Sequence, residues 1–279
     1  MMRRFGFLLL GLALLTACAD RARLIPPVSG TVWQPDNNSL DPRGNWQKTG
    51  ATELLVQWTA VDDIAFVATD LMPAAPTLPA WQRIAAEPWA EQVILGLAGR
   101  FDEKSARADM ANLAARSAAL ARLPTPLRVV GWYFPVEIDP TWAEAASLGP
   151  LLAQLPRPLW ISVYDSANVG PDALAGGLAK WLPPDIGVFF QDGVGVHARN
   201  ATVARHYADV LSAQLGKDRV RIIAEAFRPK IGGGFRSAHI TELAPQLASY
   251  AGYRIYLFDG PHYLTDALVE QVVQRQTSR

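Results

Sequence analysis

Short apolar runs, rich in β-branched and aromatic residues, alternate along this chain with alanine- and leucine-rich stretches that have helical spacing. Runs that are apolar at nearly every position are typical of strands buried on both faces, as in a parallel sheet. The pattern predicts eight such strands, at residues 29–35, 53–61, 92–99, 127–137, 158–165, 186–192, 220–227 and 253–259.

Helices are predicted between these strands, among them residues 103–123, 141–155, 172–182 and 201–216. One strand–helix unit takes roughly thirty residues, and eight units suit an α/β fold of the (β/α)8 TIM barrel type. A doubly wound sheet is the alternative, but no glycine-rich phosphate turn follows the first strand. The proline-rich residues 72–81 are expected to form a loop over one mouth of the barrel.

The N-terminus has the features of a bacterial lipoprotein signal. Met1–Arg4 is basic, residues 5–15 are an apolar run too short to span a bilayer, and Leu15-Thr16-Ala17-Cys18 resembles a lipobox. Cys18 is the single cysteine of the chain, and we expect it to carry the lipid. An ordinary signal peptide with an incidental cysteine is the alternative.

These features divide the chain into a lipoprotein signal peptide at 1–17, a tether at 18–28 and a barrel domain at 29–279. Ala19, not aspartate, follows the lipidated cysteine, and Asp20 comes next. In enteric-type bacteria, an aspartate directly after the cysteine retains a lipoprotein in the inner membrane. We therefore expect a lipid-anchored protein of the cell envelope, at the outer membrane and facing the periplasm.

The charge and the spacing of reactive residues exclude several function classes. Lys and Arg together equal Asp and Glu, at 26 each, so no basic surface is expected for nucleic acid. The four histidines form no HxH or HExxH pattern, so no metal site and no cofactor are predicted. No Gly-x-Ser-x-Gly motif is present, and the sole cysteine is the lipidation site, so a serine or cysteine nucleophile has no candidate.

The predicted strand ends carry carboxylates, amides and aromatic rings. In TIM barrels, chemistry takes place at the C-terminal ends of the strands. This mixture suits a carbohydrate, because rings pack on sugar C–H faces while amides and carboxylates bind hydroxyl groups. Trp33 and Trp132 are further candidates for such walls. The predicted substrate-binding residues are Gln34, Gln57, Trp58, Tyr133, Tyr164, Asp165, Gln191 and Asp192.

Two carboxyl groups are the predicted catalytic residues. Glu137 and Glu225 lie about three strand–helix units apart, at the ends of strands four and seven, which face each other across a barrel. Glycoside hydrolysis needs one carboxylic acid and one carboxylate. Glu137 ends the apolar segment GWYFPVEID, and desolvation there would raise its pKa, as the acid/base role requires. Glu225 would be the nucleophile or base, with Asp192 as its rival; alternatively, Glu137 caps a helix or pairs with an arginine such as Arg228.

The chain also resembles the DUF4434-type bacterial domains, a family grouped with the TIM-barrel glycoside hydrolases. The resemblance covers about residues 29–260 and implies a barrel with a polysaccharide-related role, without an established activity. In the large clan of retaining barrel hydrolases an asparagine precedes the strand-four acid, whereas this chain has Val136. The matching segments are GTVWQP (30–35), LLVQWT (54–59), WYFPVEID (132–139), WISVY (160–164) and FQDGVG (190–195).

Three functions are consistent with the sequence. The first is a membrane-anchored glycoside hydrolase-like protein that acts on a polysaccharide, either an exopolysaccharide or a cell-wall glycan. The second is a non-catalytic glycan-binding lipoprotein of a polysaccharide export or biofilm system. The third is a barrel isomerase or aldolase; an aldolase needs a strand-end lysine, for which Lys230 is the candidate. The expected partner is therefore a carbohydrate polymer or oligosaccharide.

Overall fold

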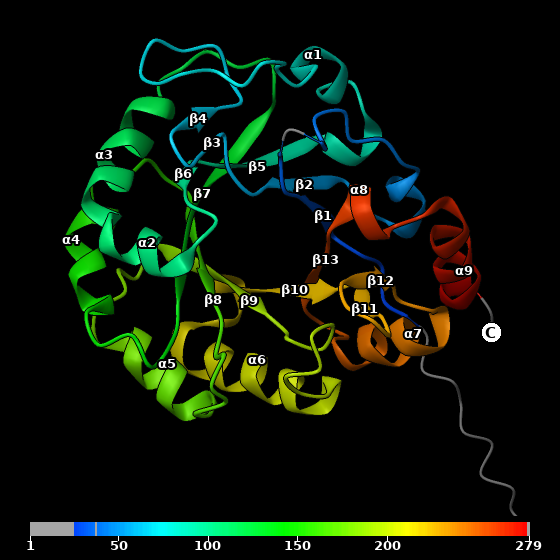
Figure 1. The fold of residues 1–279 in the computed structure, drawn as a ribbon. Helices are drawn as coiled ribbons and strands as arrows, with labels where there is room; N and C mark the ends of the chain where they lie inside the picture. The colour runs from blue at the N-terminus through cyan, green and yellow to red at the C-terminus, as the bar shows by residue number, and fades with distance from the viewer. Residues whose placement is uncertain (1–24, 37, 278–279) are drawn as a thin grey trace, which may run out of the picture.

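Eight parallel strands form a closed barrel in the computed structural model, which describes residues 25–36 and 38–277 (Figure 1). Seven strands lie within segments that the sequence predicts, and β7 runs one residue past its predicted end at 137. β13 pairs with β1 to close the barrel. The TIM barrel prediction is thereby confirmed. The barrel strands are β1 (Gly30–Trp33), β2 (Glu53–Val56), β5 (Gln92–Gly96), β7 (Val129–Ile138), β8 (Leu159–Val163), β9 (Ile186–Gln191), β10 (Val220–Glu225) and β13 (Arg254–Phe258).

Helices surround the barrel, as Figure 1 shows. Residues 103–123 form two helices instead of one, because Asp109 ends the first and begins the second. Its carboxylate accepts hydrogen bonds from Arg100 Nε (2.9 Å) and Asn112 Nδ2 (2.7 Å). The main helices are α2 (Glu103–Ala108), α3 (Met110–Leu120), α4 (Leu148–Leu152), α5 (Pro171–Ala179), α6 (Ala201–Leu215), α7 (Ile240–Ser249) and α9 (Asp266–Thr277).

The connection between β2 and β5 contains short elements in place of a long helix. The second barrel strand ends at Val56, although the sequence predicts it to continue to residue 61. The residues that follow contribute to a separate small sheet of three strands. Residues 72–80 of the predicted loop 72–81 form a loop, and Trp81 begins a short helix. The elements of this connection are β3 (Ala60–Val61), β4 (Ile64–Ala65), α1 (Trp81–Ile84) and the 3-10 helix η2 (Pro88–Ala90). The third strand of the small sheet, β6 (Ala98–Gly99), comes after β5 and pairs with β3.

Each barrel strand sends one large apolar side chain into the interior. Because strand side chains alternate between faces, this layer fixes which residues point inward above and below it. Phe189 lies at its centre, with its ring 5.8 Å from that of Tyr133 and 4.9 Å from that of Tyr256. The layer consists of Val32, Leu55, Ile94, Tyr133, Trp160, Phe189, Ile223 and Tyr256.

The packed body begins before the predicted barrel boundary at residue 29. Ile25 and Val28 are buried, and Gln276 Nε2 of α9 donates a hydrogen bond to Pro26 O (3.2 Å). Residues 25–28 therefore pack on the fold, although the sequence assigns them to the tether. The signal peptide at 1–17 and Cys18 lie outside the described residues. Across the part of the chain that is described, no helix is both long and apolar enough to cross a bilayer.

A substitution at Gly187 of β9 would test the packing of the barrel interior. A Cβ at this position would overlap the six-membered ring of Trp160. We expect Gly187→Ala to lower the free energy of unfolding by about 1–3 kcal/mol, because overpacking displaces a ring that has no free space. Thermal and denaturant unfolding measure this effect.

Gly176→Ala is the matched control. Gly176 lies in α5, and a Cβ there would meet no atom within 4 Å. Alanine is the better helix former, so this variant should be neutral or up to about 1 kcal/mol more stable. Equal stability of the two variants would contradict the assigned interior packing.

Candidate functional site

A bulge in β7 sets the direction of Glu137. Phe134 pairs with Ile161 of β8, and the next paired residue, Glu137, faces Ser162. Pro135 and Val136 are thus both extra, and an even number of extra residues keeps Glu137 on the inward face. Proline is tolerated at such a bulge because no ladder hydrogen bond needs its missing N–H. Glu137 therefore points into the mouth, meaning the end of the barrel where the strands finish.

The Glu137 carboxyl group belongs to a hydrogen-bond network over three strands. Its Oε2 accepts a hydrogen bond from Gln191 Nε2 of β9 (2.5 Å). Gln191 Nε2 also donates to Ser162 Oγ of β8 (2.7 Å), and Ser162 is hydrogen-bonded to the buried Tyr133 hydroxyl of β7. These hydrogen bonds from β8 and β9 hold the Glu137 carboxyl group in one orientation.

Glu225 ends β10 and also points inward, two residues beyond Ile223 of the interior layer. Only 7% of the residue is exposed. Its carboxylate accepts hydrogen bonds from the backbone N–H groups of Gly195 and Val196, the latter at 3.1 Å. A Cβ on Gly195 would lie 2.6 Å from Glu225 Cβ, so glycine allows this loop to reach the acid.

Burial raises the pKa values of both glutamates. It raises the pKa of Glu137 to about 7, and the negative charge of Glu103 adds to the effect while the Gln191 hydrogen bond opposes it. Burial, followed by the charge of Asp192, raises the pKa of Glu225 to about 8. These values fit the chemistry of a carboxylic acid that gives and takes protons near neutral pH.

No ion pair neutralises either glutamate among the described residues. The Arg228 guanidinium, the alternative partner, donates instead to the carbonyl oxygens of Glu225 (3.1 Å) and Phe227 (2.6 Å) and to Gln246 Oε1 (2.6 Å). Tyr164 lies near both acids, since the charges of Glu225 and Glu137 contribute to raising its pKa. The structure thus brings the two predicted acids and Tyr164 to one mouth.

Asp192 faces away from this mouth, toward α7. It is fully buried, and its carboxylate accepts hydrogen bonds from Gln246 Nε2 (2.6 Å), Tyr250 Oη (2.8 Å) and the backbone N–H groups of Val194 (3.1 Å) and Glu225 (3.2 Å). Four donors occupy its oxygens. This placement does not favour the predicted sugar contact.

Asp165 is likewise occupied by the protein itself. Its carboxylate accepts hydrogen bonds from Tyr207 Oη (2.7 Å) and from the backbone N–H groups of Val169 (2.9 Å) and Gly170 (2.8 Å). The side chain therefore shapes the loop after β8 and supports α6. A direct contact with substrate is not favoured for this residue either.

Gln34 and Gln57 remain candidates for substrate contacts. Each continues its strand two residues beyond an interior-layer residue, Val32 and Leu55, so each points inward at the mouth. Both are half-buried, and neither side-chain amide has a hydrogen bond to another described residue. They resemble Gln191 in position, and their amides are available for hydroxyl groups.

The predicted aromatic walls are mostly buried. Trp58 is 3% exposed, and its Nε1 donates to Pro35 O (2.7 Å). Phe101, with 52% exposure, contacts the Trp58 ring edge-to-face at 4.8 Å and is the more accessible ring. Tyr133 lies beneath Glu137 in the interior layer, and Trp33 is fully buried outside the barrel wall.

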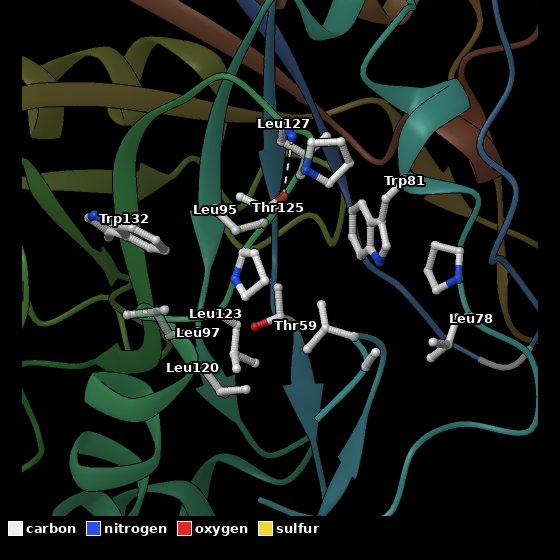
Figure 2. A pocket seen from close by; sticks show the side chains of 15 residues that line it. Thr59, Leu78, Trp81, Leu95, Leu97, Leu120, Leu123, Thr125, Leu127 and Trp132 are labelled. Atoms are coloured by element: carbon white, nitrogen blue, oxygen red, sulfur yellow. Dashed lines mark hydrogen bonds between the residues drawn. The ribbon is translucent and has the colours of Figure 1, made fainter. Parts of the chain in front are cut away.

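Trp132 lies on the outer side of β7, as its alternation with Tyr133 requires. It lines an apolar hollow of about 220 Å³ in the outer layer. Figure 2 shows this hollow, with Trp132 and Trp81 on opposite sides and Leu95 between them. None of the candidate acids lines it, so the hollow is separate from the mouth.

Sequence reasoning missed two features. Glu103 begins α2 after the third barrel strand, and its Oε2 accepts a hydrogen bond from Glu137 N (3.1 Å). A ring cluster lies just beyond Glu225, where Phe227 is 4.7 Å from Phe235 and 5.0 Å from Tyr263. Glu103 comes four residues after the predicted strand 92–99, at the start of a predicted helix, and nothing in the local sequence sets it apart from other helical acids.

Comparisons with known proteins identify the fold. No protein-family model and no curated protein matches the chain. Among solved structures, the chain is similar to a Bacteroides thetaiotaomicron protein provisionally described as an α-L-fucosidase, with a TM-score of 0.64 and 13% identity over 91% of this chain and 96% of that chain. This likeness shows a barrel fold shared with the glycoside hydrolase type, and the fold alone.

Two further structures are more distant. A chitinase of Chromobacterium violaceum has a TM-score of 0.49 and 10% identity over 90% of this chain and 100% of that chain. A tamarind chitinase-like lectin has a TM-score of 0.39 and 10% identity over 87% and 98%. Membership in the DUF4434-type family stays a prediction.

The buried acid predicts an unusual pH dependence of stability. An unfolded Glu137 ionises near its ordinary pKa of 4.5, whereas the folded side chain keeps its proton to about pH 7. In that window the unfolded state binds fewer protons, so rising pH favours unfolding. We compare the free energy of unfolding of Glu137→Gln with that of the wild type at pH 4 and at pH 8. Between these pH values the difference should change by about 2 kcal/mol in favour of the variant. Denaturant unfolding at both pH values measures it.

Glu144→Gln provides the control, because Glu144 is an exposed carboxylate on the loop after β7. It should change stability equally at the two pH values. If Glu137→Gln behaves in the same way, Glu137 is not a protonated buried acid.

Proposed function

We propose that the protein is a glycoside hydrolase of a polysaccharide, with Glu137 and Glu225 as its catalytic residues. The observation that carries the proposal is the placement of two carboxyl groups without an ion pair, the partly buried Glu137 and the buried Glu225, on the inward faces of β7 and β10 at one mouth. Hydrolysis of a glycosidic bond needs two such groups on either side of the scissile bond. The shared barrel fold is compatible with this chemistry.

The proton affinities suggest a division of roles. Glu225 has the higher pKa, because it is buried and because the negative charge of Asp192 lies close to it. Glu137 ionises first, and the Gln191 amide stabilises its carboxylate. Glu225 would then protonate the leaving oxygen, and Glu137 would attack or activate water. This order is the reverse of the one that the sequence suggests.

The surrounding groups suit a sugar. The free amides of Gln34 and Gln57 and the Tyr164 hydroxyl would bind ring hydroxyl groups. The partly exposed rings of Phe235 and Phe101 would pack on sugar faces. Lys230, which an aldolase would need, is exposed on the hairpin of β11 (Phe227–Pro229) and β12 (Phe235–Ser237), so the aldolase alternative is less favoured.

Turnover tests the proposal directly. We expect the wild type to release reducing ends from an exopolysaccharide or a cell-wall glycan. Glu137→Gln and Glu225→Gln should each lower kcat by about 10²–10⁴-fold, since each removes a proton-transfer or nucleophilic group. The pH profile should be bell-shaped, falling below about pH 7 as Glu137 is protonated and above about pH 8 as Glu225 ionises.

Glu144→Gln should keep full activity with the same profile. Glycan binding by the wild type without any turnover would refute the hydrolase and support the non-catalytic glycan-binding lipoprotein. Full turnover by both glutamine variants would refute the assigned acids.

We also propose a lipid anchor on Cys18 that holds the barrel at the outer membrane, facing the periplasm. The lipobox-like Leu15–Cys18 and the absence of aspartate at position 19 support it. Expressed with its native N-terminus, the wild type should sediment with outer membranes, and Cys18→Ser should not carry lipid in mass spectrometry. Identical masses for the mature N-terminal peptides, apart from the substitution itself, would contradict the anchor.

A further inference from the structure

Two side chains of α2 bind the peptide groups of Glu137. Glu103 Oε2 accepts a hydrogen bond from Glu137 N (3.1 Å), and Arg107 Nε donates one to Glu137 O (3.2 Å). In a parallel barrel, such groups normally pair with the neighbouring strands. On this side the ladder between β5 and β7 ends at Gly96 and Tyr133, so no β5 residue reaches Glu137. The α2 side chains take the place of that missing strand.

The local sequence explains how α2 reaches this position. Asp102 Oδ1 accepts a hydrogen bond from Ser105 N (2.8 Å), which fixes the helix start one residue before Glu103. Glu103 and Arg107 are four residues apart and lie on one helix face. Ala106 beside them is fully buried, and its small side chain allows a close approach to the barrel end.

We propose that Glu103 and Arg107 are positioning residues that clamp the Glu137 peptide and aim its carboxyl group into the mouth. The inference rests on the proposed catalytic role of Glu137, although the clamp itself is a structural feature. It adds a third acid, from the strand-three loop, to the two acids that the sequence indicated. Glu103 does not touch the reacting atoms and acts through Glu137.

The clamp also has opposing electrostatic effects on Glu137. The negative charge of Glu103 raises its pKa, and the positive charge of Arg107 lowers it. Besides Glu225 of β10, three titratable groups lie near Glu137: Asp139 just past the end of β7, Tyr133 below it and Tyr164 just past the end of β8.

Substitutions in the clamp leave those three groups unchanged. Removal of Glu103 and removal of Arg107 should therefore move the titration of Glu137 in opposite directions. General loosening of the mouth would move it in one direction in both variants.

A carboxyl-carbon NMR titration of the full barrel tests this directly. The protein is labelled with ¹³C at glutamate carboxyl groups, and the Glu137 signal is assigned by its loss in Glu137→Gln. We expect Glu103→Gln, which keeps an oxygen acceptor but loses the charge, to lower the Glu137 midpoint by about one pH unit. Arg107→Gln should raise it by a similar amount.

Two further variants control for general effects. Arg107→Lys keeps the charge and should leave the midpoint near that of the wild type. Glu144→Gln removes an exposed carboxylate on the neighbouring loop and should not move it. The proposal is overturned if Glu103→Gln and Arg107→Gln shift the midpoint the same way, or no more than Glu144→Gln does.

The titration requires no turnover, so it separates the clamp from the hydrolase proposal. Opposite shifts in a protein that cleaves no glycan would support the clamp and refute the hydrolase. If glycan is cleaved, the acid limb of the kcat profile should move with the NMR midpoint in each variant. Turnover with unshifted midpoints would overturn the clamp alone.

Discussion

The interaction on which the mouth of this barrel depends is the burial of carboxyl groups without a cation. A buried carboxylate must either collect hydrogen-bond donors or keep its proton, because an isolated charge in a low-dielectric interior is too costly. Asp192 collects four donors around its two oxygens, and these oppose the burial that still raises its pKa. Glu137 takes the second course, with one side-chain donor and a pKa of about 7. The number of donors thus separates structural acids from acids available for chemistry.

The alternation of strand residues converts this difference into a spatial arrangement. Gln191 and Asp192 are adjacent in sequence, yet Gln191 faces the mouth and binds Glu137 while Asp192 faces α7 and binds Tyr250. The outward acid still reaches the site through the backbone, since its Oδ1 accepts the N–H of Glu225. Side chains on both faces of the barrel wall therefore determine the electrostatics of a single mouth.

Much of the fold could be predicted from the sequence, because continuous apolar runs mark parallel strands. The same periodicity placed Glu137 and Glu225 at strand ends. Trp132, a candidate wall in the sequence, lies instead in the outer layer of the barrel. The aromatic walls were harder to predict, because the sequence alone does not distinguish a buried tryptophan such as Trp58 from an exposed one. Only the packed structure shows that Pro35 O accepts its indole hydrogen bond.

Glu103 illustrates a different limit. Its role depends on the bulge at Pro135 and Val136, which carries Glu137 beyond the end of the β5 ladder. A bulge and a helix start that are more than thirty residues apart must meet before the contact exists, and no local pattern reports that meeting. Sequence reasoning therefore found the acids on strands but not the acid on the loop.

Glu137 and Glu225 have one feature of their surroundings in common, but it affects their pKa values differently. The backbone N–H of each is bound by a second carboxylate, Glu103 for Glu137 and Asp192 for Glu225. Asp192 is sealed in the core, so the environment of Glu225 is fixed by packing. Glu103 is only partly buried, and its own pKa is raised to about 7, so its charge changes in the same pH range as that of Glu137. A ligand that excluded water from this side would disfavour the charged forms of Glu103 and Glu137 alike and raise both pKa values together.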